Sequence, residues 1–164
     1  MGFLDSIKKT FNGANKNSLF APLSGEVLRI EDVNDEAFSS GALGKGIAIR
    51  PSEGKLYAPC NATVDFVFET KHAFNLIAAN GAEILIHIGL DTVKLGGEPF
   101  EPKVNTGDEV KKGDLLCIID LEKIKSYGLD TATPILIANP ENFTNLTFSE
   151  NKTVQVGDEI IKFS

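Results

Sequence analysis

The dipeptide Asn80-Gly81, which stands between two apolar runs, constrains the fold more than any other feature of this sequence. Asn and Gly both tolerate positive φ, so the pair favours the two-residue type I′ turn of a β-hairpin. The runs on either side, residues 73–79 and 82–88, are apolar and of strand length. The sequence therefore predicts an antiparallel hairpin with residues 80 and 81 at its tip.

The register of this hairpin predicts which side chains meet. If the dipeptide is the whole loop, Phe74 lies opposite His87, and His72 lies opposite Gly89. Diagonal neighbours on one face are about 7–8 Å apart at the backbone, so the two histidines can touch, and Thr70 has the parity to join them. We expect one face to carry His72, Phe74, Leu76, Leu85 and His87. We expect the opposite face to be core and to carry Ile77, Ile84, Ile86 and Ile88.

Short apolar runs of this kind recur between residues 26 and 163, separated by Gly, Pro, Asn and Asp. Many short strands at such a spacing are typical of an all-β fold, either an antiparallel β-sandwich or a closed barrel. Within this region only residues 121–128 have the pattern of a short helix. The sequence therefore predicts an all-β domain with short helices only.

Two repeated elements indicate internal pseudo-symmetry. The segment that begins at Ala21-Pro22 resembles the one that begins at Ala58-Pro59, and residues 104–110 (VNTGDEV) resemble residues 154–160 (VQVGDEI). The second element has the pattern of a turn that leads into a strand. No repeat period of the kind found in solenoid proteins is present.

The composition fits one globular domain of 164 residues, with 42% hydrophobic and 24% charged residues. A net charge of −7 argues against nucleic-acid binding, which needs a basic face, and suits a partner with a positive surface. Cys60 and Cys117 lie in strand-like runs, so we expect two buried, reduced thiols. No apolar run approaches the roughly 18 residues that span a bilayer, and no signal peptide is recognisable. We therefore expect a cytoplasmic protein.

The N-terminal residues 1–18 differ from the rest of the chain. Residues 2–11 have helical periodicity, and residues 12–18 (NGANKNS) read as a linker, so the domain is expected to comprise residues 19–164. Lys8 and Lys9 could meet anionic lipid headgroups. A weak, peripheral contact with the inner face of a membrane is therefore expected of residues 2–11, with a frayed tail as the alternative. The apolar stripe would consist of Phe3, Leu4, Ile7 and Phe11.

Two histidines and a threonine could serve three kinds of chemistry. A neutral imidazole is a competent nucleophile and can carry a phosphoryl group, while a second imidazole donates to the phosphoryl oxygens and a hydroxyl orients the tautomer. Two histidines are too few for a structural zinc site, which usually has four ligands. No motif of a serine hydrolase or of a nucleotide-binding loop is present. Phosphoryl carriage is the chemistry that the residues favour.

Several segments resemble one known family. They are the first histidine motif at residues 68–74 (FETKHAF), the second at residues 83–93 (EILIHIGLDTV), the opening APLSGEV and the later GDEVKKGD. In this order and spacing, from about Leu19 to Phe163, the chain resembles the glucose-type enzyme IIA of the bacterial phosphoenolpyruvate-dependent sugar phosphotransferase system. The second motif is highly specific. The resemblance implies an antiparallel β-sandwich that can be described as a flattened barrel.

The resemblance also implies a function and a set of site residues. His87 would accept a phosphoryl group from phospho-HPr and pass it to a cysteine of a sugar-specific IIB domain, so that sugar enters through the IIC domain. His72 would support the phosphoryl group, and Thr70 would bond an active-site histidine. Asp35 and Asp91 would face an arginine of HPr. An apolar collar that docks HPr and IIB would consist of Phe38, Phe68, Phe74, Ile88 and Val93.

The resemblance leaves some alternatives open. The chain could instead be a regulatory binding module whose phosphorylation controls permeases or kinases. No cofactor is required, although zinc could bind His72 and His87 where a partner adds a carboxylate. The chain departs from the family at Lys45 and Ala62, and Glu36 and Ala37 replace apolar residues of the collar. We expect a monomer, and the sugar cannot be read from the sequence.

Overall fold

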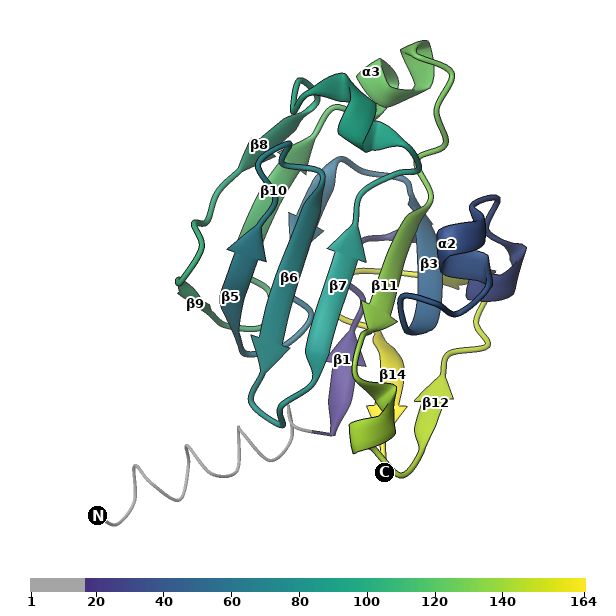
Figure 1. Ribbon diagram of the computed structural model, residues 1–164, viewed down its shortest axis with the longest axis vertical. Coiled ribbons are helices and arrows are strands. Elements are labelled where there is room, and N and C mark those ends of the chain that lie inside the picture. Colours follow the sequence, from purple (N-terminus) through teal and green to yellow (C-terminus); the bar gives the residue numbers. More distant parts are fainter. Residues whose placement is uncertain (1–16) are drawn as a thin grey trace.

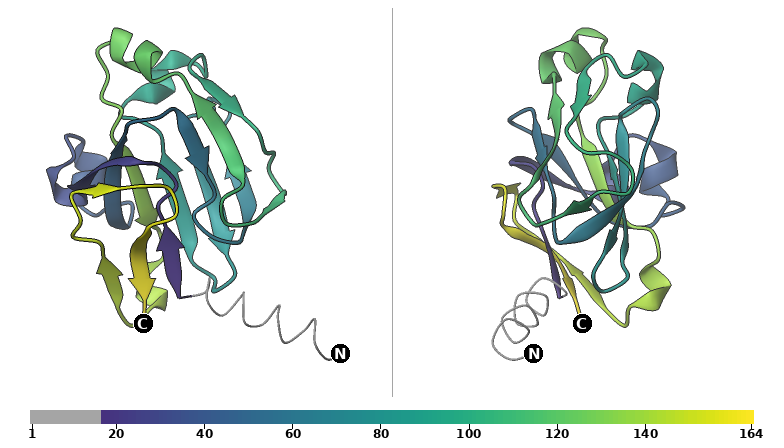
Figure 2. Two further views of the ribbon diagram at one scale, coloured as in Figure 1. Left: turned by 180° about the vertical axis from the view of Figure 1, so that it is seen from behind. Right: turned by 90° about the vertical axis from the view of Figure 1, so that its left-hand side faces the viewer.

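The computed structural model describes residues 17–164, which form an antiparallel β-sandwich (Figure 1). Its main layer is an eight-stranded sheet with the strand order β13-β2-β3-β11-β7-β6-β5-β9. Two three-stranded sheets, β1-β14-β12 and β4-β10-β8, lie behind this layer, as the reverse and side views show (Figure 2). Every strand pair is antiparallel, so the predicted fold class is confirmed.

The elements of the described residues are short. The strands are β1 (Ser18–Phe20), β2 (Gly25–Arg29), β3 (Lys45–Pro51), β4 (Lys55–Tyr57), β5 (Ala62–Val67), β6 (Ala73–Ala78), β7 (Glu83–His87), β8 (Phe100–Pro102), β9 (Glu109–Val110), β10 (Leu115–Ile119), β11 (Thr133–Ile137), β12 (Leu146–Phe148), β13 (Thr153–Val154) and β14 (Glu159–Phe163). The α-helices are α2 (Glu36–Ser39) and α3 (Leu121–Ser126), and the 3-10 turns are Ile30–Asp32, Thr92–Leu95 and Pro140–Asn142.

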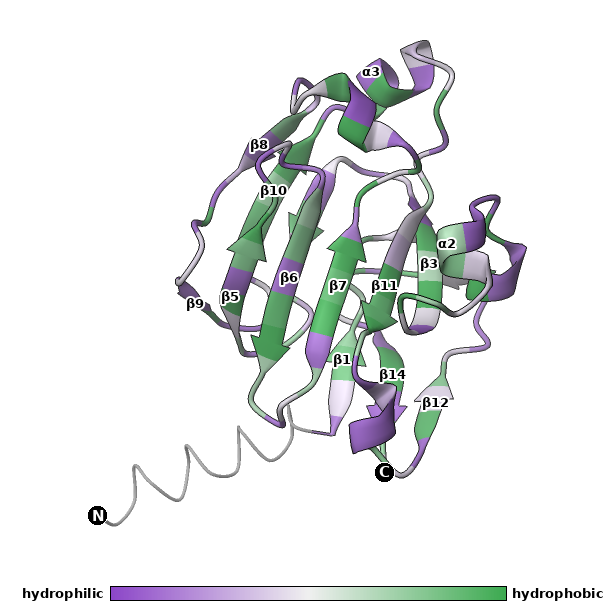
Figure 3. Ribbon diagram, viewed as in Figure 1, coloured by the Kyte–Doolittle hydropathy of each residue, from purple (hydrophilic) through white to green (hydrophobic). Residues whose placement is uncertain are grey.

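Successive side chains of a strand point to opposite faces of the sheet, and apolar residues form a cluster on each face of the large sheet. The main core lies between the layers, where β6 and β7 are largely hydrophobic ribbons (Figure 3). A smaller cluster on the outer face packs Phe38 of α2 against Ala48 and Leu136. Helix α2 therefore covers one end of the outer face and leaves the surface of β5, β6 and β7 open.

The hairpin of β6 and β7 has the predicted partners but a different register. Ala73 pairs with His87 and Phe74 with Ile86, which is one residue away from the prediction. The loop contains three residues rather than two, because Ala78 is the residue that bonds Ala82 across its mouth. A one-residue shift exchanges the faces of a strand. The predicted set of residues that share a face with His87 was therefore wrong for Phe74 and Leu76, which are buried in the main core with Ile84, Ile86 and Ile88.

The repeated turn explains the internal symmetry. Three turns of the pattern V-x-x-G-D, at residues 104–108, 110–114 and 154–158, each contain a glycine with φ near 90° and an aspartate that accepts a 2.8 Å bond from a backbone N–H. The backbone of Ala21 exchanges two hydrogen bonds with the turn at 154–158, and that of Ala58 exchanges two with the turn at 110–114. The equivalent of 154–158 is thus 110–114, a copy that the sequence comparison missed.

Other predictions on the fold have mixed outcomes. The apolar runs between residues 26 and 163 form strands as predicted, and the helix predicted at 121–128 is present as α3, Leu121–Ser126. Short elements such as α2 and β12 were missed, because four or three residues carry too little periodicity to detect. Cys60 and Cys117 are buried free thiols, as predicted. The predicted membrane-surface segment, residues 2–11, lies outside the described residues. Within the described range, no helix is long and apolar enough to cross a membrane.

Candidate functional site

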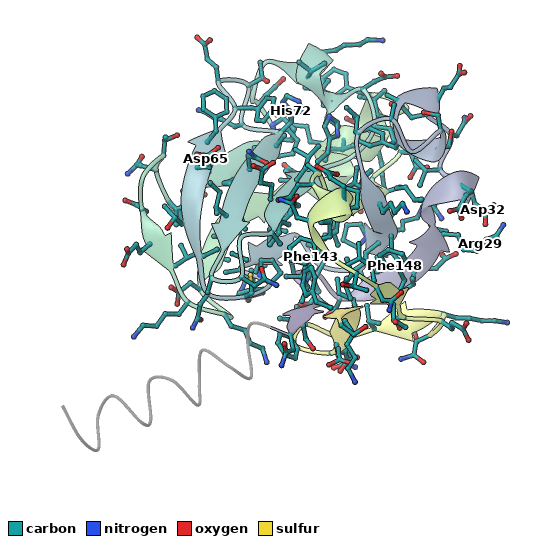
Figure 4. All side chains as sticks on the ribbon, turned by 60° about the horizontal axis from the view of Figure 1, so that its bottom comes forward. Arg29, Asp32, Asp65, His72, Phe143 and Phe148 are labelled. Atoms are coloured by element: carbon teal, nitrogen blue, oxygen red, sulfur yellow. The ribbon has the colours of Figure 1, made fainter. Side chains whose placement is uncertain are left out.

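His72 and His87 meet at one end of the large sheet. His87 is the last residue of β7 and His72 directly precedes β6, so the antiparallel hairpin brings them to the same end of the sheet. Their ring centroids are 4.8 Å apart, with the ring planes at 80°. Figure 4 shows His72 at the end of the molecule away from Phe143 and Phe148. The predicted meeting of the two histidines is confirmed, although the predicted register was wrong.

Backbone turns at the strand ends make this meeting possible. The backbone carbonyl of His72 accepts a 2.7 Å bond from the N–H of Ile88, which continues the β-ladder by one step. Beyond this bond the chain turns away on both strands. Lys71 has φ of 62° and Gly89 has φ of 74°. Lys71 and Asp91 are the two non-glycine residues with positive φ in residues 17–164, and both flank the histidines. Such strained backbone is often concentrated at functional sites.

Each histidine is oriented by one hydrogen bond from its Nδ1 atom. His87 Nδ1 lies 2.8 Å from the carbonyl oxygen of Gly89. A carbonyl can only accept, so Nδ1 of neutral His87 carries the proton and Nε2 keeps its lone pair. His72 Nδ1 lies 2.6 Å from Thr70 Oγ1. If the hydroxyl donates, Nε2 of His72 carries the proton and is a hydrogen-bond donor.

The surroundings of both rings favour the neutral imidazole. His72 is only 4% exposed, and burial together with the neighbouring His87 lowers its pKa to about 4. Burial also lowers the pKa of His87, and the bond to Gly89 and the carboxylates of Asp35 and Asp91 partly oppose this effect. Both rings are thus uncharged at neutral pH. A neutral ring with a free Nε2 lone pair is the form that acts as a nucleophile.

The aromatic residues around the pair are only partly those that were predicted. Phe68 lies edge-on to His72, with the ring centroids 5.5 Å apart, and is half-buried. Val93 is 48% exposed. Phe38 contacts the His87 ring at 4.9 Å but is buried, so it supports the ring and offers little surface. The structure also adds Phe66, which packs on Phe68 and is 47% exposed.

Two members of the predicted collar belong to the core. Phe74 and Ile88 are fully buried between the sheets, so they cannot be part of a docking surface. The predicted register had placed Phe74 on the outer face, and the one-residue shift turns it inward. The same register had already placed Ile88 in the core, against the collar that the resemblance implied. The alternation itself contained the missed signal. Asn75 and Glu83 are polar and share the outer face with His87, whereas Phe74 does not.

The two predicted acidic residues stand beside His87 and are held differently. Asp35 is the N-cap of α2, where its side chain accepts a 3.0 Å bond from the N–H of Ala37. Asp91 follows Leu90 in the turn after β7 with φ of 59° and is exposed. In residues 17–164 no group of three or more His, Cys, Asp or Glu side chains is arranged to hold a metal ion.

Comparisons with known proteins agree with this fold and site. The model of the family described as phosphoenolpyruvate-dependent sugar phosphotransferase system, EIIA 1, matches residues 17–143. A glucose-specific EIIA component from Buchnera aphidicola is 44% identical over 151 residues, 92% of this chain and 93% of the relative. The structure of glucose permease IIA from Mycoplasma capricolum matches with a TM-score of 0.83 at 35% identity, covering 88% of this chain and 93% of that one.

A relative of a different size shares the same domain. The beta-glucoside-specific EIIBCA component of Dickeya chrysanthemi is 52% identical over 126 residues, which are 77% of this chain but 20% of the relative. The chain thus spans about a fifth of the length of such EIIBCA relatives. Fold and comparisons together define a phosphotransferase component of a sugar transport system. The chain belongs to the EIIA 1 family of the phosphoenolpyruvate-dependent sugar phosphotransferase system, as its sequence motifs predicted.

Proposed function

We propose that Nε2 of His87 accepts a phosphoryl group from phospho-HPr and passes it to the cysteine of a sugar-specific IIB domain. The observation that supports this most directly is the bond from His87 Nδ1 to the Gly89 carbonyl, which leaves the Nε2 lone pair free. In the acceptance step, Nε2 forms a bond to phosphorus while the bond between phosphorus and the donor breaks. In the second step the IIB thiolate forms the new bond and the P–N bond to His87 breaks.

His72, oriented by Thr70, would donate to the phosphoryl oxygens rather than carry the group. With Thr70 Oγ1 donating to His72 Nδ1 at 2.6 Å, Nε2 of His72 holds a proton that it can donate. A donor held in place where negative charge accumulates stabilises the transferring group. The 4.8 Å ring separation puts His72 close enough to serve a group on His87.

The surface around the site suits brief encounters with partners. Phe66, Phe68 and Val93 offer apolar contact, and Asp35 and Asp91 add negative charge close to His87. Net charge of −7 favours partners with a positive docking face and speeds their association without requiring tight binding. A relay needs this combination of quick arrival and quick release. We further propose that the protein acts in the cytoplasm and that residues 2–11 make a weak contact with the inner face of the membrane.

The decisive experiment is mass spectrometry of the full chain after incubation with phosphoenolpyruvate, enzyme I and HPr. We expect one added phosphoryl group that is acid-labile, and none on His87→Ala. His72→Gln is the matched control, because it alters the other ring and should still accept the group. An acid-labile phosphate on His87→Ala would show that the acceptor is a different residue.

A further inference from the structure

The peptide group between Gly89 and Leu90 links the active-site ring to a distant loop. Its carbonyl accepts the bond from His87 Nδ1, and its N–H, which belongs to Leu90, donates a 2.9 Å bond to the carbonyl of Asp130. Hydrogen bonds in such a chain polarise and strengthen one another. The N–H of Gly89 also points to this loop, 3.4 Å from Thr133 Oγ1. The orientation of the His87 ring thus depends on where residues 130–133 lie.

An ion pair fixes this loop on the neighbouring strand. Arg50 of β3 donates from Nε and Nη2 to the two carboxylate oxygens of Asp130, at 3.1 and 3.0 Å. Oδ1 of Asp130 also accepts a 2.9 Å bond from the N–H of Ala132. Two-point contacts between guanidinium and carboxylate fix direction as well as distance. A second carboxylate, that of Glu26, lies 3.7 Å from Arg50 on its other side.

We propose that Arg50 and Asp130 are positioning residues for phosphoryl transfer, acting on His87 through the Gly89–Leu90 peptide. The ion pair holds the Asp130 carbonyl toward the Leu90 N–H, which in turn holds the Gly89 carbonyl toward His87 Nδ1. This arrangement favours the tautomer whose Nε2 lone pair is free, and it fixes the ring. The proposal rests on His87 as the phosphoryl acceptor, but its effect on the ring exists without phosphorylation.

Four variants test the pair in the full chain: two single substitutions, their combination and a charge-retaining substitution. Arg50→Met keeps the aliphatic stem and removes the charge, and Asp130→Asn keeps the bond to Ala132 and weakens the ion pair. We expect each variant to accept the phosphoryl group from phospho-HPr roughly tenfold more slowly, since small misplacements of a reacting group are costly. The double variant should be no slower than either single one. Arg50→Lys, which retains the charge, should recover part of the rate.

The direct readout is ¹⁵N NMR of the unphosphorylated protein, which distinguishes protonated from unprotonated ring nitrogens. We expect wild-type His87 to have Nδ1 protonated and Nε2 unprotonated, and Arg50→Met and Asp130→Asn to show a mixture. A normal rate together with an unchanged His87 spectrum in both variants would overturn the proposal. If the wild type takes no phosphate at His87, the proposed function fails, while the NMR result still decides whether the pair positions the ring.

The matched control is the ion pair of Glu98 and Lys123. It is also a contact between separate elements, at 2.8 Å and with comparable exposure of both side chains, 49% and 37% against 34% and 41% for Asp130 and Arg50. In the described part of the chain, none of the hydrogen bonds of Glu98 and Lys123 reaches residues 87–91. Glu98→Gln should therefore leave the rate and the His87 spectrum unchanged. An equal loss of rate in this variant would mean that the Arg50 and Asp130 variants act through general destabilisation of the fold.

Discussion

Gly81 and Gly89 share a left-handed backbone, with φ of 87° and 74°, but only Gly89 is enclosed. A Cβ atom on Gly89 would lie 2.6 Å from Thr92 Cγ2 and 3.1 Å from the carbonyl oxygen of Asp130, whereas one on Gly81 would meet nothing within 4 Å. Thr92 cannot easily yield, because it is fully buried and its hydroxyl donates to the carbonyl of Ile88. Substitution of Gly81 would therefore cause backbone strain alone, whereas substitution of Gly89 would add a steric clash to the same strain.

This comparison predicts different outcomes for two alanine variants. Gly81→Ala should lower the free energy of unfolding by about 1 kcal/mol, the usual cost of a left-handed non-glycine residue. Gly89→Ala should lower it by about 2–4 kcal/mol, since overpacking adds to the strain. Its displaced carbonyl should also slow phosphorylation of His87 at least tenfold. Denaturant unfolding and the phosphorylation assay check both values, and equal effects of the two variants would contradict the enclosed site of Gly89.

The hairpin shows where sequence reasoning succeeded and where it failed. Asn80-Gly81 located the turn, but Gly81 alone takes positive φ, and Asn80 instead uses its side chain to accept a 3.0 Å bond from the N–H of Ala82. The loop therefore gains a residue and the register moves by one. The histidines meet nevertheless, because both stand at strand ends where the chain turns away from the regular ladder. Their pairing was predictable from the sequence, and the direction of the neighbouring side chains was not.

The supporting groups of the site were out of reach for another reason. Arg50 and Asp130 are 80 residues apart and meet only because β3 and β11 are neighbours in the large sheet. A single sequence gives no indication of that strand order, since the connections between these strands are long. Thr70 was predictable, because it lies two residues from His72. The contact of Thr70 with His72 was thus predictable from the sequence, whereas the contact of Arg50 with Asp130, which depends on the strand order, was not.

His72→Gln should separate acceptance from delivery of the phosphoryl group. The amide of glutamine can donate hydrogen bonds but lacks the fixed ring that Thr70 orients, so the group on His87 is less well stabilised during transfer. We expect the variant to accept phosphate from phospho-HPr and to pass it to IIB about a hundredfold more slowly. Rapid-quench measurement of the two half-reactions checks this. Normal delivery would leave His72 with a structural role only.

The bond between Thr70 and His72 can be tested by a matched pair of substitutions. Thr70→Val keeps the shape and removes the hydroxyl, so Nδ1 of His72 loses its partner and the proton can shift between the ring nitrogens. Thr70→Ser keeps the hydroxyl. We expect delivery to IIB to fall roughly tenfold in Thr70→Val and to remain near normal in Thr70→Ser. A similar loss in both would point to the methyl group, and no loss in either would exclude the proposed role of the hydroxyl.

The depressed pKa of His72 predicts how stability depends on pH. In the folded chain burial and the neighbouring His87 lower the pKa of His72 to about 4, whereas the unfolded chain has an ordinary value near 6.5. Between these values the unfolded state binds a proton that the folded state does not. Stability therefore rises with pH through this window, and it is lost as pH falls from about 6.5 to about 4.

The comparison with His72→Gln isolates this contribution, because glutamine does not titrate and the other groups remain. Between pH 6.5 and pH 4 the wild type should lose more free energy of unfolding than the variant, by an amount on the order of 2 kcal/mol. Urea unfolding at several pH values measures the difference. His87 is retained in both proteins, so its own titration largely cancels. Parallel stability curves for the two proteins would mean that His72 titrates in the folded state as it does in the unfolded chain, and that its ring is open to water rather than buried against His87.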